Sequence, residues 1–472
     1  MNDLANLPII MTNMARKRAP TATTQTQPAT TVEIYDRGRW LPAATLQALG
    51  EDRCRFEYLP EYVFSDDPRP IAVGLPIGIE PDRFIEGPTG TEADRRPPAF
   101  LYDLVPQGKG RKYLLERLGL TDGDNLNMPL VMAGAFNPIG CLRFMSALEF
   151  FRQESERHPD PATATGFDFE EVLTRSQEFL DHLSLHAMLA SGTTGVQGVA
   201  PKFLLTTDRD GRWFADMALS DDRAHEHWLL KLPRGKSDAD RAVLRNEAGF
   251  LRVAERCGMR TFAKPDLHNE ILFVRRFDRQ VIDGQMHRLH QESLASVCGI
   301  RGFSVPKSQQ TLLAGLRSAV TNPLAETIEF MKRDVLNMAM RNTDNHARNT
   351  AVQRLPDGTI QLTPVFDFAP MYLDSEVIVR GCHWRGAEGR VQRTWTEVVE
   401  SLDMPDHERK QIAAELTRFA DVVAALPATA KECEVEPEVI EACRKTIETQ
   451  ADQLQALAHL AAANASPENV HG

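Results

Sequence analysis

An Asp and an Asn five residues apart, at the end of a helix-like run, constrain this chain more than any other feature. They are Asp344 and Asn349, and a second Asp, Asp367, follows inside the apolar, strand-like segment 364–368. One carboxylate can orient and deprotonate an incoming hydroxyl, while a carboxylate and an amide oxygen can hold the magnesium that neutralises phosphates. Asp344 suits the first role, and Asn349 with Asp367 suits the second. The pattern therefore predicts a phosphoryl-transfer site.

The spacing alone leaves a second interpretation open. It equals the Asp-to-Asn spacing of the protein-kinase catalytic loop, although the His-Arg-Asp lead-in of that loop is missing. Asn and Asp are also common turn residues, so Asp344 and Asn342 can cap a turn while Asp367 ends a strand. Both interpretations stay open on this stretch.

Composition narrows the class of protein. The 472 residues suffice for two to four domain-sized units with ordinary cores. Seven scattered cysteines without a CxxC pair signal neither a disulfide framework nor a zinc site. No apolar run approaches the length of a membrane span, so we expect a soluble, cytoplasmic protein without a membrane partner. A net charge of −12 argues against a chain-wide footprint for DNA or RNA.

The first 150 residues divide into a tail and a small unit. Residues 1–31, rich in Thr, Ala, Pro and Gln, are expected to form a disordered tail. Residues 32–150 are expected to form a small α+β unit. Its expected strands are 32–35, 55–58 and 71–77, and its helical segments are 98–106 and 112–120.

A polar stretch with two prolines, 152–166, is expected to be a linker or surface loop, and a helix is expected over 170–190. A loop with three glycines, among them Gly195 and Gly198, then runs into the apolar segment that follows Lys202. Glycines let backbone amides approach phosphates closely, although an ordinary hairpin explains the same residues.

Lys231 lies between apolar residues in the strand-like run 228–233. A lysine in such a strand requires an anionic partner, and nucleotide phosphates are one standard partner. An edge strand with Lys231 in water is the alternative. Glu247, where we expect a helix to begin, can reach Lys231 as the orienting carboxylate of a kinase does, or it can be an exposed helix-start residue.

The strand-like segment 270–279 ends in a charged turn with Arg276 and Phe277. In a kinase-like layout this segment would form the connector whose backbone reads adenine. From His290 onward the chain is expected to be mostly helical, with one strand pair near 359–373. Three closing helices, 395–402, 407–426 and 438–463, are expected to be structural.

Several of these motifs, in this order, resemble the HipA family of bacterial serine/threonine kinases, the toxins of HipB-HipA toxin-antitoxin pairs. The matching residues are Pro201-Lys202, Leu230-Lys231-Leu232-Pro233, Asn246-Glu247, Arg276-Phe277-Asp278-Arg279, His290-Gln291-Glu292, Asn342 to Asn349, and Phe366-Asp367. The segments Pro98-Ala99-Phe100 and Gly140 to Phe144 are similar to the family's N-terminal subdomain.

The resemblance implies an α+β, two-lobed, protein-kinase-like fold that binds ATP and magnesium. It divides the chain after the tail into an N-terminal subdomain (32–150), a lobe with a glycine loop (151–280) and a mainly helical lobe (281–472). It implies that Lys231 holds phosphates, Asp344 is the catalytic base, and Asn349 and Asp367 bind metal. The remaining nucleotide-binding candidates are Lys202, Glu247, Arg276, Phe277, Gly195 and Gly198.

The family also implies a helix-turn-helix antitoxin of the HipB type, DNA contact only through that antitoxin, and a protein substrate, an aminoacyl-tRNA synthetase in some members. Three departures stand out. The family's His-Gln-Glu-Asp ends in Ser293 here, its lysine before the catalytic-loop Asn is Arg348, and the glycine loop is longer by about three residues. The loop hydroxyls that could be autophosphorylated, with an inhibitory effect, are Ser191, Thr193 and Thr194.

Three other functions compete with a protein kinase. One is a catalytically weak scaffold or corepressor of an antitoxin-DNA complex, and the presence of Asp344, Asn349 and Asp367 argues against it. Another is a hydrolase metal held by Asp344, His346 and Asp367, which leaves Lys231 without a role. A small-molecule kinase remains open, because an acceptor site leaves little trace in sequence.

Overall fold

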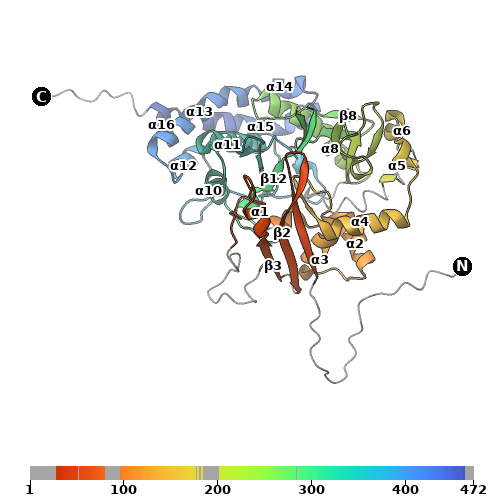
Figure 1. Cartoon of the computed structure of the whole chain (residues 1–472). Helices are drawn as coiled ribbons and strands as arrows, with labels where there is room; N and C mark the ends of the chain where they lie inside the picture. Colours follow the sequence, from red (N-terminus) through yellow and green to blue (C-terminus); the bar gives the residue numbers. More distant parts are fainter. Residues whose placement is uncertain are drawn as a thin grey trace.

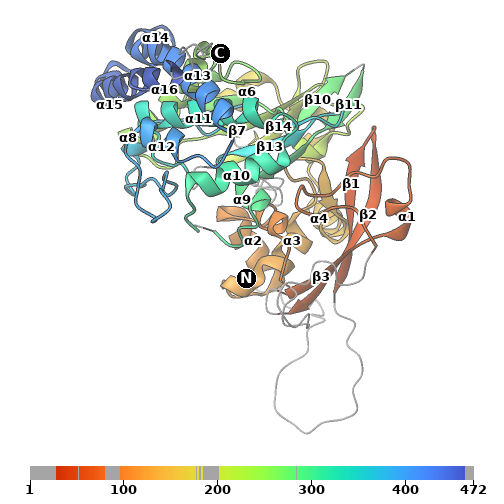
Figure 2. The same cartoon turned by 90° about the vertical axis from the view of Figure 1, so that its left-hand side faces the viewer.

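The computed structural model describes residues 28–50, 53–79, 96–176, 178–179, 182–183, 201–282, 284–303 and 305–462. Helices and strands alternate in three parts of the chain, as expected for an α+β protein (Figure 1). In Figure 2 the N-terminal part, in red and orange, lies at the opposite end of the molecule from the last helices, in blue.

The N-terminal part is a four-stranded antiparallel sheet in the order β3-β2-β1-β4, covered by short helices. The expected strand 32–35 is part of a hairpin, in which Asp36 and Arg39 close the turn between β1 and β2. Its elements are β1 (Ala29–Asp36), β2 (Arg39–Gly50), β3 (Arg53–Tyr58), α1 (Pro60–Val63), η2 (Ala99–Asp103), α2 (Gly108–Leu118), η3 (Asp124–Leu126), α3 (Asn127–Gly134), β4 (Leu142–Phe144) and α4 (Met145–Arg157).

Three expectations for this part were wrong in detail. Residues 29–31 belong to β1 rather than to the tail, because they pair with residues 45–47 of β2. Residues 71–77 form turns instead of a strand. The expected linker 152–166 is partly helical, since α4 continues to Arg157 and α5 (Ala162–Thr165) follows.

The central part holds a five-stranded antiparallel sheet in the order β6-β5-β7-β9-β8. Strand β7 is therefore central, with β5 and β9 on its two sides. The elements are α6 (Phe169–Thr174), β5 (Lys202–Thr207), β6 (Trp213–Ala215), η4 (Asp216–Ala218), β7 (Glu226–Lys231), α8 (Asp238–Arg256), β8 (Asp266–His268) and β9 (Ile271–Arg275). The helix expected over 170–190 is interrupted, because α6 ends at Thr174 and Arg175 has a positive φ, while the described residues 178–179 and 182–183 are again helical.

Helix α8 begins nine residues before the position that we expected from the sequence. Ser237 caps it, accepting a hydrogen bond from the Asp240 backbone while the Asp240 side chain accepts one from the Ser237 backbone. Such a capping box satisfies two of the backbone groups that a helix start leaves unpaired. Glu247 is consequently a buried mid-helix residue, and the alternative of an exposed helix-start glutamate is excluded.

Helix α8 is also fastened to the C-terminal helices. Asn246 donates a hydrogen bond of 2.8 Å to Glu436 Oε2 and accepts one of 2.9 Å from the Glu436 backbone. A Cβ atom on Gly249 would lie 2.8 Å from Val435 Cγ2 and 3.0 Å from the Cys433 carbonyl oxygen. The approach is so close that only a residue without a side chain fits there.

The C-terminal part is mainly helical around one large apolar core, as predicted. Its three-stranded sheet has the order β12-β13-β14. The strand pair expected near 359–373 was misplaced, because only β14 lies there, its partner β13 precedes it, and residues 363–373 form no strand. The elements are β10 (Arg279–Ile282), β11 (Gln285–Arg288), β12 (His290–Ser293), α9 (Leu294–Val297), α10 (Gln309–Ala319), α11 (Pro323–Ala339), β13 (Ala351–Arg354), β14 (Ile360–Leu362), η5 (Met371–Leu373), α12 (Trp395–Glu400), α13 (Asp406–Ala424), α14 (Leu426–Glu432), α15 (Pro437–Gln455) and α16 (Ala458–Ala462).

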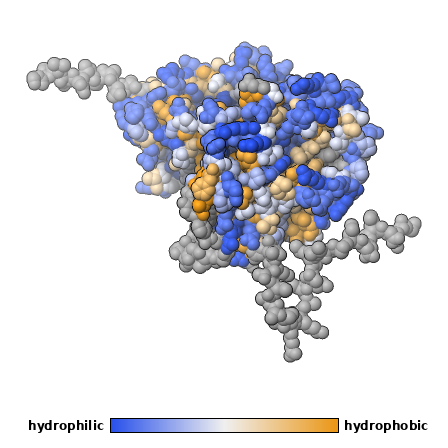
Figure 3. Space-filling view, viewed as in Figure 1, coloured by the Kyte–Doolittle hydropathy of each residue, from blue (hydrophilic) through white to orange (hydrophobic). Residues whose placement is uncertain are grey.

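The visible surface is mostly hydrophilic, with apolar side chains in small patches (Figure 3). Among the helices of the described residues, none combines the length and the apolar character needed to cross a membrane.

Candidate active site

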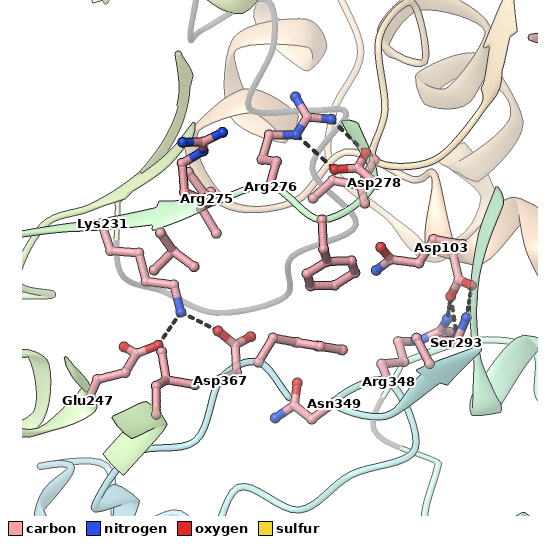
Figure 4. A pocket seen from close by; sticks show the side chains of 18 of the residues that line it. Asp103, Lys231, Glu247, Arg275, Arg276, Asp278, Ser293, Arg348, Asn349 and Asp367 are labelled. Atoms are coloured by element: carbon pink, nitrogen blue, oxygen red, sulfur yellow. Dashed lines mark hydrogen bonds and ion pairs between the residues drawn. The ribbon is translucent and has the colours of Figure 1, made fainter. Parts of the chain in front are cut away.

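Lys231, at the end of the central strand β7, is 4% exposed and lies between two carboxylates. Its Nζ atom is 2.5 Å from Glu247 Oε1 and forms a second ion pair with Asp367 Oδ1. The alternative of an edge-strand lysine in water is therefore excluded. Figure 4 shows the Lys231 ammonium between the two carboxylates.

The Asp367 carboxylate forms ion pairs with both lysines of the site. Lys202 Nζ, from the start of β5, lies 3.4 Å from Asp367 Oδ2. The sequence placed Asp367 inside a strand, but β14 ends at Leu362 and Asp367 has φ of +50°. Aspartate tolerates this left-handed conformation better than most residues. The turn directs the carboxylate toward β5 and β7.

Burial and charge oppose each other in this cluster. Burial lowers the pKa of Lys231, but the carboxylates of Asp367 and Glu247 outweigh it, and the net shift is upward. Burial raises the pKa of Asp367, but the ammonium groups of Lys202 and Lys231 outweigh it, and the net shift is downward. Burial dominates at Lys202, whose pKa is lowered. Lys231 and Asp367 are thus held in their charged forms.

The loop that carries Asp344 is anchored below by a buried carboxylate, Asp334 of helix α11. Asp334 Oδ1 accepts a hydrogen bond of 2.6 Å from Asn345 Nδ2, and Arg380 and Trp384 also donate to this carboxylate. At the helix end, the Asn342 backbone donates 2.8 Å to the Asn337 carbonyl. These contacts fix the loop on both sides of Asp344.

Asp344 and Asn349 lie next to each other. Asn349 Nδ2 donates a hydrogen bond of 2.7 Å to the Asp344 carbonyl oxygen, which leaves the Asn349 amide oxygen available as a ligand. The Asp344 side chain is 28% exposed, and His346 Nε2 lies 3.6 Å from its Oδ1 atom. Asp344 also borders a wide cavity between residues 295–306 and 379–382, so an acceptor hydroxyl can approach it from outside.

A cavity of about 930 Å³, including its open mouth, is lined by Lys231, Glu247, Asn349 and Asp367, and Lys202 and Asp344 border an adjoining pocket. The lining of the cavity combines apolar side chains, which can accept a flat ring, with charged and amide groups. Its apolar lining comes from Leu104, Ile139, Leu229, Leu251, Val274, Phe277, Ala351 and Phe366, and its polar lining includes Lys231, Glu247, Asn349 and Asp367. Figure 4 shows the polar side chains converging on this space.

The connector after β9 behaves differently at its two predicted residues. Phe277 is half-buried against Phe366, with 6.2 Å between the ring centroids, and lines the cavity. The Arg276 guanidinium is buried and forms ion pairs of 2.7 Å with Asp216 and 2.8 Å with Asp278. Arg276 therefore borders the cavity while its charge is committed to neighbouring carboxylates.

That ion-pair network also binds the N-terminal part. Asp278 Oδ2 accepts a hydrogen bond of 2.8 Å from the Gly140 backbone, and Arg279 donates one of 2.7 Å to the Gly140 carbonyl. Asn137 Nδ2 donates 2.6 Å to Asp216 Oδ2. The loop 137–140 is thereby held against the connector.

Sequence reasoning missed two carboxylates of the site, Asp103 and Asp334. Asp334 had a weak signal, because it is an acidic residue on the apolar face of a helix. Asp103 had none, since it lies in the N-terminal part and reaches the cavity only through the fold. Five predicted residues lie outside the described residues: Gly195, Gly198, Ser191, Thr193 and Thr194.

The donor set fits a magnesium-nucleotide complex. Asp367 offers an anionic oxygen and Asn349 a neutral one, which suits a metal that takes its remaining ligands from phosphates and water. Within the described ranges there is no cluster of three or more His, Cys, Asp and Glu side chains placed to hold a metal ion. The two lysines supply charge for phosphates, and the apolar wall suits an adenine ring.

Comparisons with known proteins agree with this architecture. The HipA N-terminal domain model matches residues 39–145, and the HipA-like C-terminal domain model matches residues 194–426. The serine/threonine-protein kinase toxin HipA of Shewanella oneidensis is 25% identical over 310 residues, which are 61% of this chain and 66% of that relative. The match thus covers just under two thirds of that relative's own length. The Sinorhizobium fredii protein Y4dM is 23% identical over 350 residues, 69% of this chain and 74% of Y4dM.

Among solved structures, HipA of Shewanella oneidensis in complex with HipB and operator DNA aligns with a TM-score of 0.60 at 19% identity. The alignment covers 91% of this chain and 99% of that one. It confirms the predicted two-lobed, kinase-like α+β fold, with a sheet lobe and a helical lobe on either side of the cavity.

Proposed function

The chain belongs to the HipA family, and from that premise we propose that it is an ATP- and magnesium-dependent serine/threonine protein kinase. One observation carries the proposal: Lys231 lies between Glu247 and Asp367 on the cavity that Asn349 also lines, and Asp344 borders an adjoining pocket with Lys231 and Asp367. Phosphoryl transfer depends mostly on positioning and on charge neutralisation, and these residue types supply both.

Each residue has a role that its contacts support. Glu247 orients Lys231, and Lys231 with Lys202 would hold the nucleotide phosphates. Bound magnesium, held by Asp367 and Asn349, would neutralise phosphate charge. Asp344 would accept the proton of the attacking hydroxyl, since its carboxylate is the exposed one beside the open cavity.

Asp367→Asn is expected to remove the magnesium dependence of nucleotide binding. Even partners outside a metal's ligand set cost about 10- to 100-fold in metal affinity when mutated, so losing an anionic ligand should cost at least about tenfold. Without magnesium the variant should bind the nucleotide as well as wild type or better, because Lys231 and Lys202 lose a competing carboxylate. Isothermal titration with a non-hydrolysable ATP analogue, with and without magnesium, measures both.

The matched control is Asp210→Asn, the same change at an exposed residue of the sheet lobe. It should leave both affinities unchanged. A wild-type protein whose nucleotide affinity does not respond to magnesium would contradict the metal assignment.

We also propose a protein acceptor and a HipB-like helix-turn-helix antitoxin, with DNA contacted only through the antitoxin. The support is that the HipA structure matched above was solved as a complex with HipB and operator DNA. An aminoacyl-tRNA synthetase is one candidate acceptor. Co-purification with an antitoxin encoded beside the gene tests the partner, and labelling of purified proteins against small-molecule acceptors separates a protein kinase from a small-molecule kinase.

Autophosphorylation of Ser191, Thr193 or Thr194 is expected to weaken nucleotide binding. A phosphoryl group adds about −1.5 to −2 charges at neutral pH, and these residues shortly precede Lys202, which reaches the proposed phosphate site. Mass spectrometry after incubation with ATP and magnesium, followed by titration of the modified protein, tests this. Modification restricted to other residues, or unchanged affinity after modification at these, would refute it.

A further inference from the structure

The N-terminal part contributes a half-buried carboxylate, Asp103, to the wall of the nucleotide cavity. Asp103, the last residue of η2, accepts hydrogen bonds of 2.7 Å from Ser293 Oγ and 2.9 Å from the Ser293 backbone. It also forms an ion pair with Arg348. Figure 4 shows Asp103, Ser293 and Arg348 grouped on the side of the cavity opposite Lys231.

Arg348 directly precedes Asn349, the proposed metal ligand. Its guanidinium is held from two sides, because Nη1 pairs with Asp103 while Nη2 donates 2.9 Å to the Gly302 carbonyl. The Arg348 backbone donates 3.2 Å to His346 Nδ1, and the Asn349 backbone donates 2.9 Å to the His346 carbonyl. Asn349 is therefore the next residue after one whose side chain is held at both ends, and its own backbone is fixed to His346.

Asp103 is poorly explained as a stabilising residue alone. Burial raises the pKa of Asp103, and it outweighs the opposing effects of Arg348 and Ser293. A buried ion pair of this kind is weak evidence for stability, because desolvation offsets its attraction. The N-terminal part is already held to the connector at its other end, through Gly140 and Asp278.

We propose that Asp103 is a positioning residue, through which the N-terminal part fixes Arg348 and so places Asn349 for magnesium. The metal-nucleotide site is then complete only when the N-terminal part is docked. Ser293 and Arg348, which depart from the family pattern, both contact this one carboxylate. The inference rests on the proposed kinase function, but its main test does not require transfer activity.

Asp103→Asn tests the proposal by titration with a non-hydrolysable ATP analogue. The variant removes the carboxylate charge and keeps the side-chain shape. Without magnesium, its nucleotide affinity should stay within about twofold of wild type. The gain in affinity from magnesium should fall about tenfold, and kcat should fall about 10- to 100-fold, the loss that a small misplacement of a catalytic group produces.

Asp122→Asn is the matched control, because it removes a carboxylate that pairs with Arg111 at the exposed surface of the same part. It should change neither the gain in nucleotide affinity from magnesium nor kcat. Arg348→Lys keeps the positive charge but loses the forked guanidinium that joins Asp103 to Gly302, so it should also lose the gain in nucleotide affinity from magnesium. The double variant, Asp103→Asn with Arg348→Lys, should be no worse than either single variant.

The outcomes separate the proposals. If Asp103→Asn weakens nucleotide binding equally with and without magnesium, or changes neither affinity, the positioning role is overturned. Should Asp103→Asn fail to fold, Arg348→Lys decides by the same criterion. A wild-type protein without transfer activity would contradict the proposed function, while the magnesium-dependent binding still decides the role of Asp103.

Discussion

Asp344→Asn is expected to lower phosphoryl transfer by about two to four orders of magnitude, the usual contribution of a general base. Nucleotide affinity should be nearly unchanged, because this carboxylate acts on the acceptor hydroxyl in the transition state. The fold should also persist, since the loop is anchored by its neighbour Asn345 on Asp334. Initial rates with a protein acceptor, together with nucleotide titration and thermal unfolding, measure all three.

Asp403→Asn provides the control, because it makes the same change at an exposed residue of the helical lobe. It should leave transfer and unfolding unaltered. If Asp344→Asn instead unfolds the protein, Asp344 is a structural cap, and the turn interpretation of its sequence motif replaces the catalytic one.

Asp278→Asn is expected to lower the free energy of unfolding by about 3–5 kcal/mol, the cost of removing one partner from a buried ion pair. Asp278 accepts hydrogen bonds from Arg276, Arg279 and the Gly140 backbone, and its loss leaves two buried guanidinium groups undercompensated. The variant also weakens the attachment of the N-terminal part. Urea unfolding at neutral pH measures the effect.

The pH dependence of this network has a defined sign. Burial raises the pKa of Asp278, but Arg276 and Arg279 outweigh it and hold the pKa well below its usual range. Because the folded-state pKa is depressed, the stabilisation is complete above the unfolded value of about 4 and is lost as pH falls toward the folded value. The Asn variant should therefore differ most from wild type at neutral pH and least in strong acid.

Asp122→Asn is a suitable reference for stability too, because an exposed ion pair contributes only about 0–1 kcal/mol. A loss below about 1 kcal/mol for Asp278→Asn would show that the network is dispensable for folding.

Local sequence patterns predicted which side chains come together at the cavity better than they predicted the elements that carry them. A lysine inside an apolar strand and a nearby glutamate are local patterns, and Lys231 and Glu247 are paired in the structure. The start of α8 was misplaced because the capping box at Ser237 lies in a polar segment without an apolar period. Asp367 was assigned to a strand, since the positive φ of an aspartate leaves no mark in the sequence.

Other features depend on contacts between distant residues. Asp103 is 190 residues from Ser293 and 245 from Arg348, and no periodicity or spacing connects them. Strand β12 was missed for a related reason. Its four residues include His290 and Glu292, and only pairing with β13 makes them a strand.

The attachment of α8 to the C-terminal helices limits how this protein can be switched. In protein kinases, the position of the helix that carries the orienting glutamate is a common control point, because rotating it outward breaks the pair with lysine. Here Asn246 and Gly249 hold that helix against Glu436 and Val435, one residue before and two residues after Glu247. Outward rotation of α8 would break both contacts. Inhibition is therefore expected to act on nucleotide access or on the acceptor, and the pair of Lys231 and Glu247 should persist in the inactive state.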